Sequence, residues 1–135
     1  MIKRDDPLDS RPVDFLRGRI RSFELAFSGL WHVFRTQPNI WIHLGTSIIV
    51  VAMGLWLGLE QYEWLAMILV IGLVWTVEIL NTALEVIVNI ASPERHPLAK
   101  LAKDVAAAAV LIAALISEVV GAIVLGPPLL KALGF

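Results

Sequence analysis

Cysteine is absent from this chain of 135 residues, and charged residues are scarce at 17%. The lack of cysteine excludes disulfides and thiolate metal sites. Soluble domains carry about 25% charged residues, whereas here the few charges cluster and 58% of the residues are hydrophobic. We therefore expect a membrane protein, with one domain because the length is too short for two.

Two phosphate-binding signatures of soluble folds are also missing. The chain has no GxxxxGK[ST] loop and no GxGxxG turn, so any phosphate chemistry needs another scaffold. No uninterrupted apolar core follows a basic start within residues 1–35, and we expect no cleaved signal peptide. The net charge of −1 gives no indication of nucleic-acid binding, and we expect no such partner.

Long apolar runs occupy most of the sequence after residue 39. We predict three transmembrane helices at about residues 40–59, 64–90 and 99–125, because each run reaches the roughly 20 residues that cross about 30 Å of hydrocarbon. The fold class is therefore all-α. We expect Gly126-Pro127 to break the third helix, which leaves residues 127–135 as a tail beyond the membrane domain of residues 14–126.

The lysines and arginines are distributed unevenly around these runs. Seven precede the first run, three lie between residue 90 and the start of the uninterrupted apolar stretch at Val105, and only Lys131 follows the third run. Because positive residues are retained on the cytoplasmic side, we predict a cytoplasmic amino terminus and a carboxyl terminus outside. The tail at residues 127–135 is then extracytoplasmic.

An apolar stripe precedes the first predicted span. Within residues 14–36 apolar side chains recur at steps of three and four, namely Leu16, Ile20, Phe23, Phe27, Leu30 and Phe34. This spacing predicts an amphipathic helix in the cytoplasmic membrane interface, with packing on a partner protein as the less favoured alternative. Residues 1–13, where prolines lie among charges, are expected to form a flexible cytoplasmic tail.

The second predicted span carries a line of polar residues. Glu78, Asn81, Glu85 and Asn89 are spaced by three, four and four residues, which places them on one face of a helix. Carboxylates inside a membrane are costly unless they meet water, a cation or other polar groups. From the helical rise we expect Glu85 near the cytoplasmic interface and Glu78 within the inner leaflet. A lipid headgroup and a water-soluble reactant can meet between them.

The loop after this span supplies complementary charges. The stretch "SPERHPLAKLAKD" brings them to the same side of the membrane: Glu94, Arg95, His96, Lys100, Lys103 and Asp104. Carboxylates such as Glu85 and Asp104 can hold Mg²⁺ together with phosphates, and Lys103 and Arg95 can neutralise phosphate charge. Cation, metal ligands and a base are the parts that a phosphoryl transfer needs.

Other interpretations of these residues remain open. A polar line can also hold helices together or line an ion or proton path, although two glutamates beside a basic loop favour a site. Arg95 and Lys100 individually fit topology or lipid-headgroup roles better than ligand roles. We assign no chemistry to His32 and His43, and we interpret Glu118, near the outer end of the third span, as structural.

The polar line and the loop together resemble a known family. "EILNTALE" followed by "SPERHPLAKLAKD" is similar to the prokaryotic diacylglycerol kinase and undecaprenol kinase family of small membrane enzymes, and the likeness spans about residues 20–126. The stretch "HPLAKLAKD" is closer to the undecaprenol kinase branch. The resemblance implies a homotrimer with shared sites in the bacterial inner (plasma) membrane. It also implies phosphorylation of a lipid hydroxyl, on undecaprenol or diacylglycerol, with ATP and Mg²⁺ at the cytoplasmic face.

The resemblance also assigns roles by position. Glu78 corresponds to the general base and Glu85 to a magnesium ligand, and Asn81 is a catalytic residue that positions groups beside Glu85. The residues matched to nucleotide binding are Glu85, Glu94, Arg95, His96, Lys103 and Asp104.

Three positions depart from the pattern of this family. Gln37 stands where a second metal-binding glutamate is usual, Asn89 where aspartate is frequent, and Leu25 where a nucleotide-contacting tyrosine is common. We keep Gln37 as a candidate metal ligand and expect weaker magnesium binding. An alternative is a catalytically impaired member that acts as a structural or lipid-binding subunit. A small ion or proton conductor that uses Glu78 ranks last.

Overall fold

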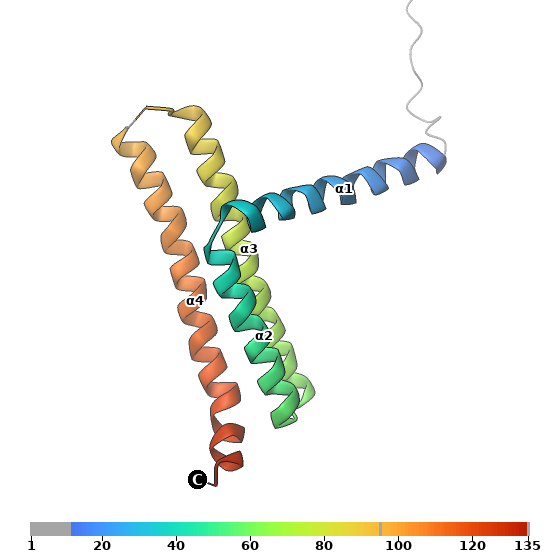
Figure 1. Cartoon of the computed structure of the whole chain (residues 1–135), viewed down its shortest axis with the longest axis vertical. Helices are drawn as coiled ribbons and strands as arrows, with labels where there is room; N and C mark the ends of the chain where they lie inside the picture. Colours follow the sequence, from blue (N-terminus) through green and yellow to red (C-terminus); the bar gives the residue numbers. More distant parts are fainter. Residues whose placement is uncertain (1–11, 95, 135) are drawn as a thin grey trace, which may run out of the picture.

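The computed structural model describes residues 12–94 and 96–134. These residues form four α-helices and no strand: α1 (Pro12–Thr36), α2 (Asn39–Leu57), α3 (Gln61–Ala91) and α4 (Pro97–Ala132). Helices α2, α3 and α4 pack as an up-and-down bundle, from which α1 projects sideways (Figure 1). In the described part of the chain, α2, α3 and α4 are the helices long and apolar enough to cross a membrane. The prediction of an all-α protein with three helices able to span a membrane is confirmed, while the homotrimer stays a prediction.

The turn between α2 and α3 follows from two capping arrangements. Gly58 ends α2 with a φ of 70°, and its N–H is bonded to the carbonyl of Gly54; the left-handed conformation favours glycine because a Cβ would clash. Glu60 and Glu63 then form a capping box at the start of α3. Gly54 also permits a close approach, since a Cβ there would lie 2.8 Å from the Trp64 ring.

The expected helix break at Gly126-Pro127 is wrong. Helix α4 continues through Pro127 and Pro128 and ends at Ala132. A proline normally clashes with the side chain of the preceding residue in a helix, but Gly126 has none. The two prolines lack the N–H groups that would bond the carbonyls of Ile123 and Val124, and the helix ends soon after them, at Ala132. The predicted extracytoplasmic tail therefore begins inside α4, and its side of the membrane stays a prediction.

Helix α1 contacts the bundle through its last turns. Phe23 and Phe27 are 66% and 69% exposed, whereas Val33 is 4% exposed. The ring of Phe34 packs against the rings of Trp41 on α2 and Trp75 on α3, at centroid distances of 5.7 Å and 5.8 Å. The predicted helix over residues 14–36 is therefore present, while its location in the membrane interface stays a prediction. The predicted tail at residues 1–13 lies largely outside the described residues.

The buried face of α3 changes in character along the helix. Its buried side chains are spaced by three or four residues, apart from one adjacent pair at the end, and they are Met67, Val70, Val74, Glu78, Asn81 and Thr82. Near the α2–α3 turn, Met67 joins Leu59 and Leu125 in a small apolar cluster. Toward the α3–α4 loop the same face carries the buried side chains of Glu78 and Asn81. The first half of the polar line thus faces the interior of the bundle, whereas Glu85 is half-buried and Asn89 is exposed.

Candidate active site

Glu78 lies beside a small cavity between the three long helices. Its side chain is 1% exposed, and its two carboxylate oxygens accept no hydrogen bond from the described residues. The cavity has a volume of about 300 Å³ and is lined by polar groups of α2 and α3 and by small or apolar side chains of α4. A buried carboxylate without hydrogen bonds is costly. This geometry suits a group that receives a proton from a ligand in the cavity.

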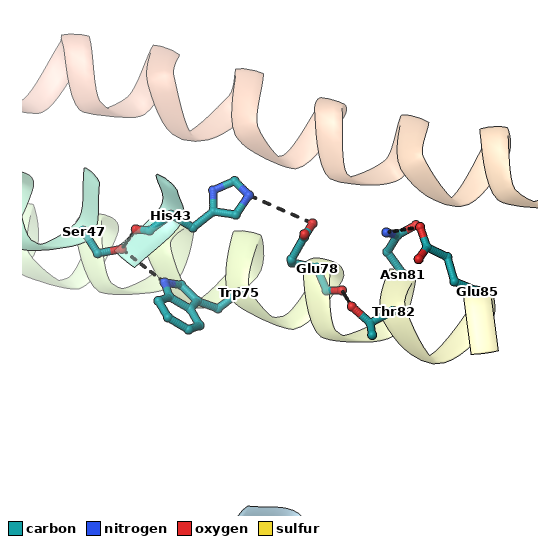
Figure 2. A network of polar contacts seen from close by, with 7 residues as sticks. All are labelled: His43, Ser47, Trp75, Glu78, Asn81, Thr82 and Glu85. Atoms are coloured by element: carbon teal, nitrogen blue, oxygen red, sulfur yellow. Dashed lines mark hydrogen bonds and ion pairs between the residues drawn. The ribbon is translucent and has the colours of Figure 1, made fainter. Parts of the chain in front are cut away.

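His43 on α2 faces Glu78 across this cavity. Its Nε2 lies 4.0 Å from Oε2 of Glu78, and its side chain is 18% exposed. Figure 2 shows the two side chains pointing toward one another, with Asn81 and Glu85 further along α3. The distance is that of an ion pair rather than a hydrogen bond.

Glu85 is held by two amide side chains. Nε2 of Gln37, in the link between α1 and α2, donates to Oε2 of Glu85 at 3.0 Å. Nδ2 of Asn81 lies 3.5 Å from the other carboxylate oxygen. The structure therefore brings the two predicted metal ligands together, with Asn81 beside them. Gln37 presents its amide nitrogen to Glu85, so that it must turn its amide over before its carbonyl oxygen can bind a cation.

The acidic groups near Glu85 are few. Among residues 12–94 and 96–134, no group of three or more His, Cys, Asp or Glu side chains is placed to hold a metal ion. Magnesium in nucleotide enzymes commonly takes one or two carboxylates and completes its shell with phosphates and water. Glu85, with the carbonyl oxygen of Gln37 after rotation, fits a magnesium ion that arrives with a nucleotide.

A second cavity lies where α3 meets α4. Its volume is about 650 Å³, and its polar lining consists of Asn89, Ser92, Glu94, His96, Lys100 and Lys103. The volume is within the range of small-molecule sites. Nζ of Lys103 donates to Oδ1 of Asn89 at 2.6 Å, which joins the two helices across the cavity. The imidazole of His96 caps α4 by accepting a hydrogen bond from the N–H of Leu98 at 3.2 Å.

The predicted nucleotide residues are only partly gathered in this cavity. Glu94, His96 and Lys103 line it, whereas Asp104 is exposed and does not. Arg95 lies outside the described residues. Lys100 lines the same cavity, although the sequence favoured a topology or headgroup role for it.

Sequence reasoning missed His43. An ionisable residue inside a predicted span is a candidate for function by default, and His43 lies within the first predicted span. Because His43 lies near the predicted membrane boundary, it was interpreted as an interfacial residue without a chemical role. The partner, Glu78, is on a different helix, and no spacing rule along one helix connects the two.

Comparison with known proteins gives consistent matches. The family model described as prokaryotic diacylglycerol kinase matches residues 24–125. An undecaprenol kinase of Bacillus subtilis is 38% identical over 81% of this chain and 89% of its own length. A diacylglycerol kinase of Synechocystis is 42% identical over 82% of this chain, and one of Escherichia coli is 36% identical over 58%. These two matches span only 63% and 64% of the relatives' own lengths.

Proposed function

The chain belongs to the prokaryotic diacylglycerol kinase family, and we propose that it transfers the γ-phosphoryl group of ATP to the hydroxyl of a membrane lipid. The observation that carries this proposal is the buried, unbonded carboxylate of Glu78 beside a cavity among membrane-spanning helices. A larger cavity, whose lining includes Lys100 and Lys103, lies where α3 and α4 meet at their connecting loop. The two cavities suit a lipid hydroxyl and a nucleotide.

Glu78 is the general base of the proposed reaction. As the lipid oxygen attacks the γ-phosphorus, its proton passes to the Glu78 carboxylate, the new O–P bond forms and the bond from phosphorus to the ADP oxygen breaks. The side chain is already desolvated, since it is 1% exposed. Such a base can act on a hydroxyl at a depth that bulk water does not reach.

The phosphates are held by groups at the ends of α3 and α4. Lys103 supplies positive charge, and its bond to Asn89 fixes the ammonium at the wall of the cavity. Asn89 is neutral, so the charge of Lys103 is not cancelled by its partner. Glu85 and Gln37 would hold the magnesium ion, which supplies further positive charge to the transferring phosphates.

Undecaprenol is the preferred acceptor, and diacylglycerol is the second candidate. Overall similarity does not separate the two acceptors, because the undecaprenol kinase is 38% identical and the Synechocystis diacylglycerol kinase 42% identical. The loop sequence "HPLAKLAKD" supports undecaprenol. We further propose that the enzyme is a homotrimer in the bacterial inner membrane with its amino terminus in the cytoplasm. The distribution of lysine and arginine supports this orientation.

A kinase assay tests the function. Purified protein is given labelled ATP, Mg²⁺ and either undecaprenol or diacylglycerol in mixed micelles, and the labelled lipid is counted. We expect transfer to undecaprenol at the higher kcat/KM. Glu78→Gln should lower the rate about 10²-fold or more, because it removes the general base, while nucleotide binding is retained.

Glu24→Gln is the matched control, since it makes the same change in an exposed side chain of α1, and it should keep most of the activity. Absence of transfer to either lipid by the wild-type protein rejects the kinase function. In that case the impaired-member alternative, which Gln37 motivates, gains support if Gln37→Glu creates activity.

A further inference from the structure

Among the described residues, His43 is the basic side chain within ion-pair distance of Glu78. The carboxylate is almost fully buried and accepts no hydrogen bond, and Nε2 of His43 is 4.0 Å away. An ionised carboxylate in such surroundings needs an opposite charge or hydrogen bonds to persist. The described neighbours of Glu78 in the cavity are otherwise neutral amides and apolar side chains.

The position of His43 is fixed by a second contact between the same two helices. Nε1 of Trp75 donates to Oγ of Ser47 at 3.1 Å, and the Ser47 hydroxyl donates to the backbone carbonyl of His43 at 2.7 Å. Ser47 lies four residues after His43 on α2, and Trp75 three residues before Glu78 on α3, so both pairs face one another in register (Figure 2). The Ser47–Trp75 bond therefore holds the two helices where His43 meets Glu78.

His43 also lies at the junction of two cavities. It lines the cavity beside Glu78 and a second one of about 290 Å³ that extends toward Ser47 and Trp75. The ionisable side chains that line these two cavities with it are Glu78 on α3 and Glu118 on α4. The imidazole thus borders both cavities, each of which has one glutamate in its lining.

We propose that His43 is the positioning residue and counter-ion of Glu78, an assignment that rests on the proposed kinase function. Its imidazole faces one carboxylate oxygen and orients the side chain, so that the other oxygen is directed to the lipid hydroxyl. His43 does not touch the phosphates, because the nucleotide cavity is lined by other residues at the α3–α4 loop. It acts through Glu78.

A double-mutant cycle tests this assignment. His43→Gln is measured in the wild-type protein and in Glu78→Gln, with lipid phosphorylation as the readout. We expect kcat to fall about 10- to 100-fold in the presence of Glu78 and less than about threefold in its absence, because His43 has no carboxylate left to act on. The KM for ATP should change less than about twofold in both backgrounds.

His32→Gln is the matched control, because His32 is an exposed histidine on α1, and it should leave kcat within about twofold of wild type. Equal losses from His43→Gln with and without Glu78 overturn the assignment, since they indicate a packing role. A wild-type rate in His43→Gln overturns it as well.

A second readout separates this inference from the proposed function. The same four proteins are compared by thermal unfolding in detergent micelles, which requires no catalysis. We expect His43→Gln to lower the midpoint more in the wild-type background than in the Glu78→Gln background, because only the former leaves an unpaired buried carboxylate. Additive midpoints overturn the ion pair. Coupled midpoints in a protein without kinase activity would support the pair while rejecting the function.

Discussion

At the scale of single residues, Gln37 determines how much negative charge surrounds the proposed magnesium ion. Its amide donates to Glu85 at 3.0 Å, so a glutamate at position 37 would place a second carboxylate beside the first. Ligand charge raises the affinity of an oxygen site for a divalent cation. We expect Gln37→Glu to lower the Mg²⁺ concentration for half-maximal rate about tenfold, as measured by titrating Mg²⁺ at fixed ATP.

Gln61→Glu is the control for this change. Gln61 is exposed at the start of α3, away from the site, and the same substitution there should leave the Mg²⁺ requirement unaltered. Thermal unfolding with and without Mg²⁺ gives a measurement independent of turnover, because a bound ion raises the midpoint by mass action. An unchanged Mg²⁺ dependence in Gln37→Glu would remove Gln37 from the metal site.

The sequence predicted the residues of α3 better than their partners. Glu78 and Asn81 were identifiable because three- and four-residue spacing fixes a common face within one helix, and the structure buries that face. His43 was not identifiable as their neighbour, because its proximity depends on how α2 packs on α3. The hydrogen bond from the Gln37 amide to Glu85 likewise depends on how the α1–α2 link packs against α3, and the family resemblance gives no information on that packing.

At the scale of the helices, Gly54 allows α2 and α3 to approach closely at their shared turn. A Cβ on Gly54 would lie 2.8 Å from the Trp64 ring and 3.0 Å from Leu59. Gly54→Ala should therefore destabilise the fold by about 1–3 kcal/mol through overpacking. Gly45→Ala is the control, since nothing lies within 4 Å of a Cβ there, and it should leave stability unchanged or raise it.

Thermal unfolding midpoints of the two variants in the same detergent decide this prediction. Equal midpoints would indicate that the Trp64 ring moves aside at little cost.

The ends of the helices were less predictable from the sequence than the existence of the helices. Length and hydropathy indicated three spans, but the continuation of α4 through Pro127 depends on a missing side chain at Gly126.

At the scale of the whole molecule, one copy of the chain has too few helices to enclose both cavities. Among the described residues, the cavity at the α3–α4 loop is lined by the ends of α3 and α4 and by the loop between them, and we expect neighbouring copies of the proposed trimer to complete it. Mixing Glu78→Gln subunits with Lys103→Ala subunits should then restore activity. Random assembly in equal amounts gives about one quarter of the wild-type rate if each site takes these two residues from different subunits.

Each variant treated alone in the same way provides the baseline for this experiment. The mixed subunits must be unfolded and reassembled together, so that trimers containing both variants can form. A mixture no more active than its components would place Glu78 and Lys103 of one site on the same subunit. The sequence could not decide between these arrangements, because the contacts of a chain with its own copies are not encoded in the periodicity of any one helix.

The location of Glu78 about halfway along a membrane-spanning helix also determines how the reaction rate depends on the concentration of the lipid acceptor. A lipid can reach that depth by lateral diffusion and need never be extracted into water. Enzyme and acceptor then encounter one another in a two-dimensional fluid. The turnover of such a catalyst follows the mole fraction of acceptor among the surrounding lipids, and inert lipid acts as a diluent in the same way that solvent does for a dissolved reactant.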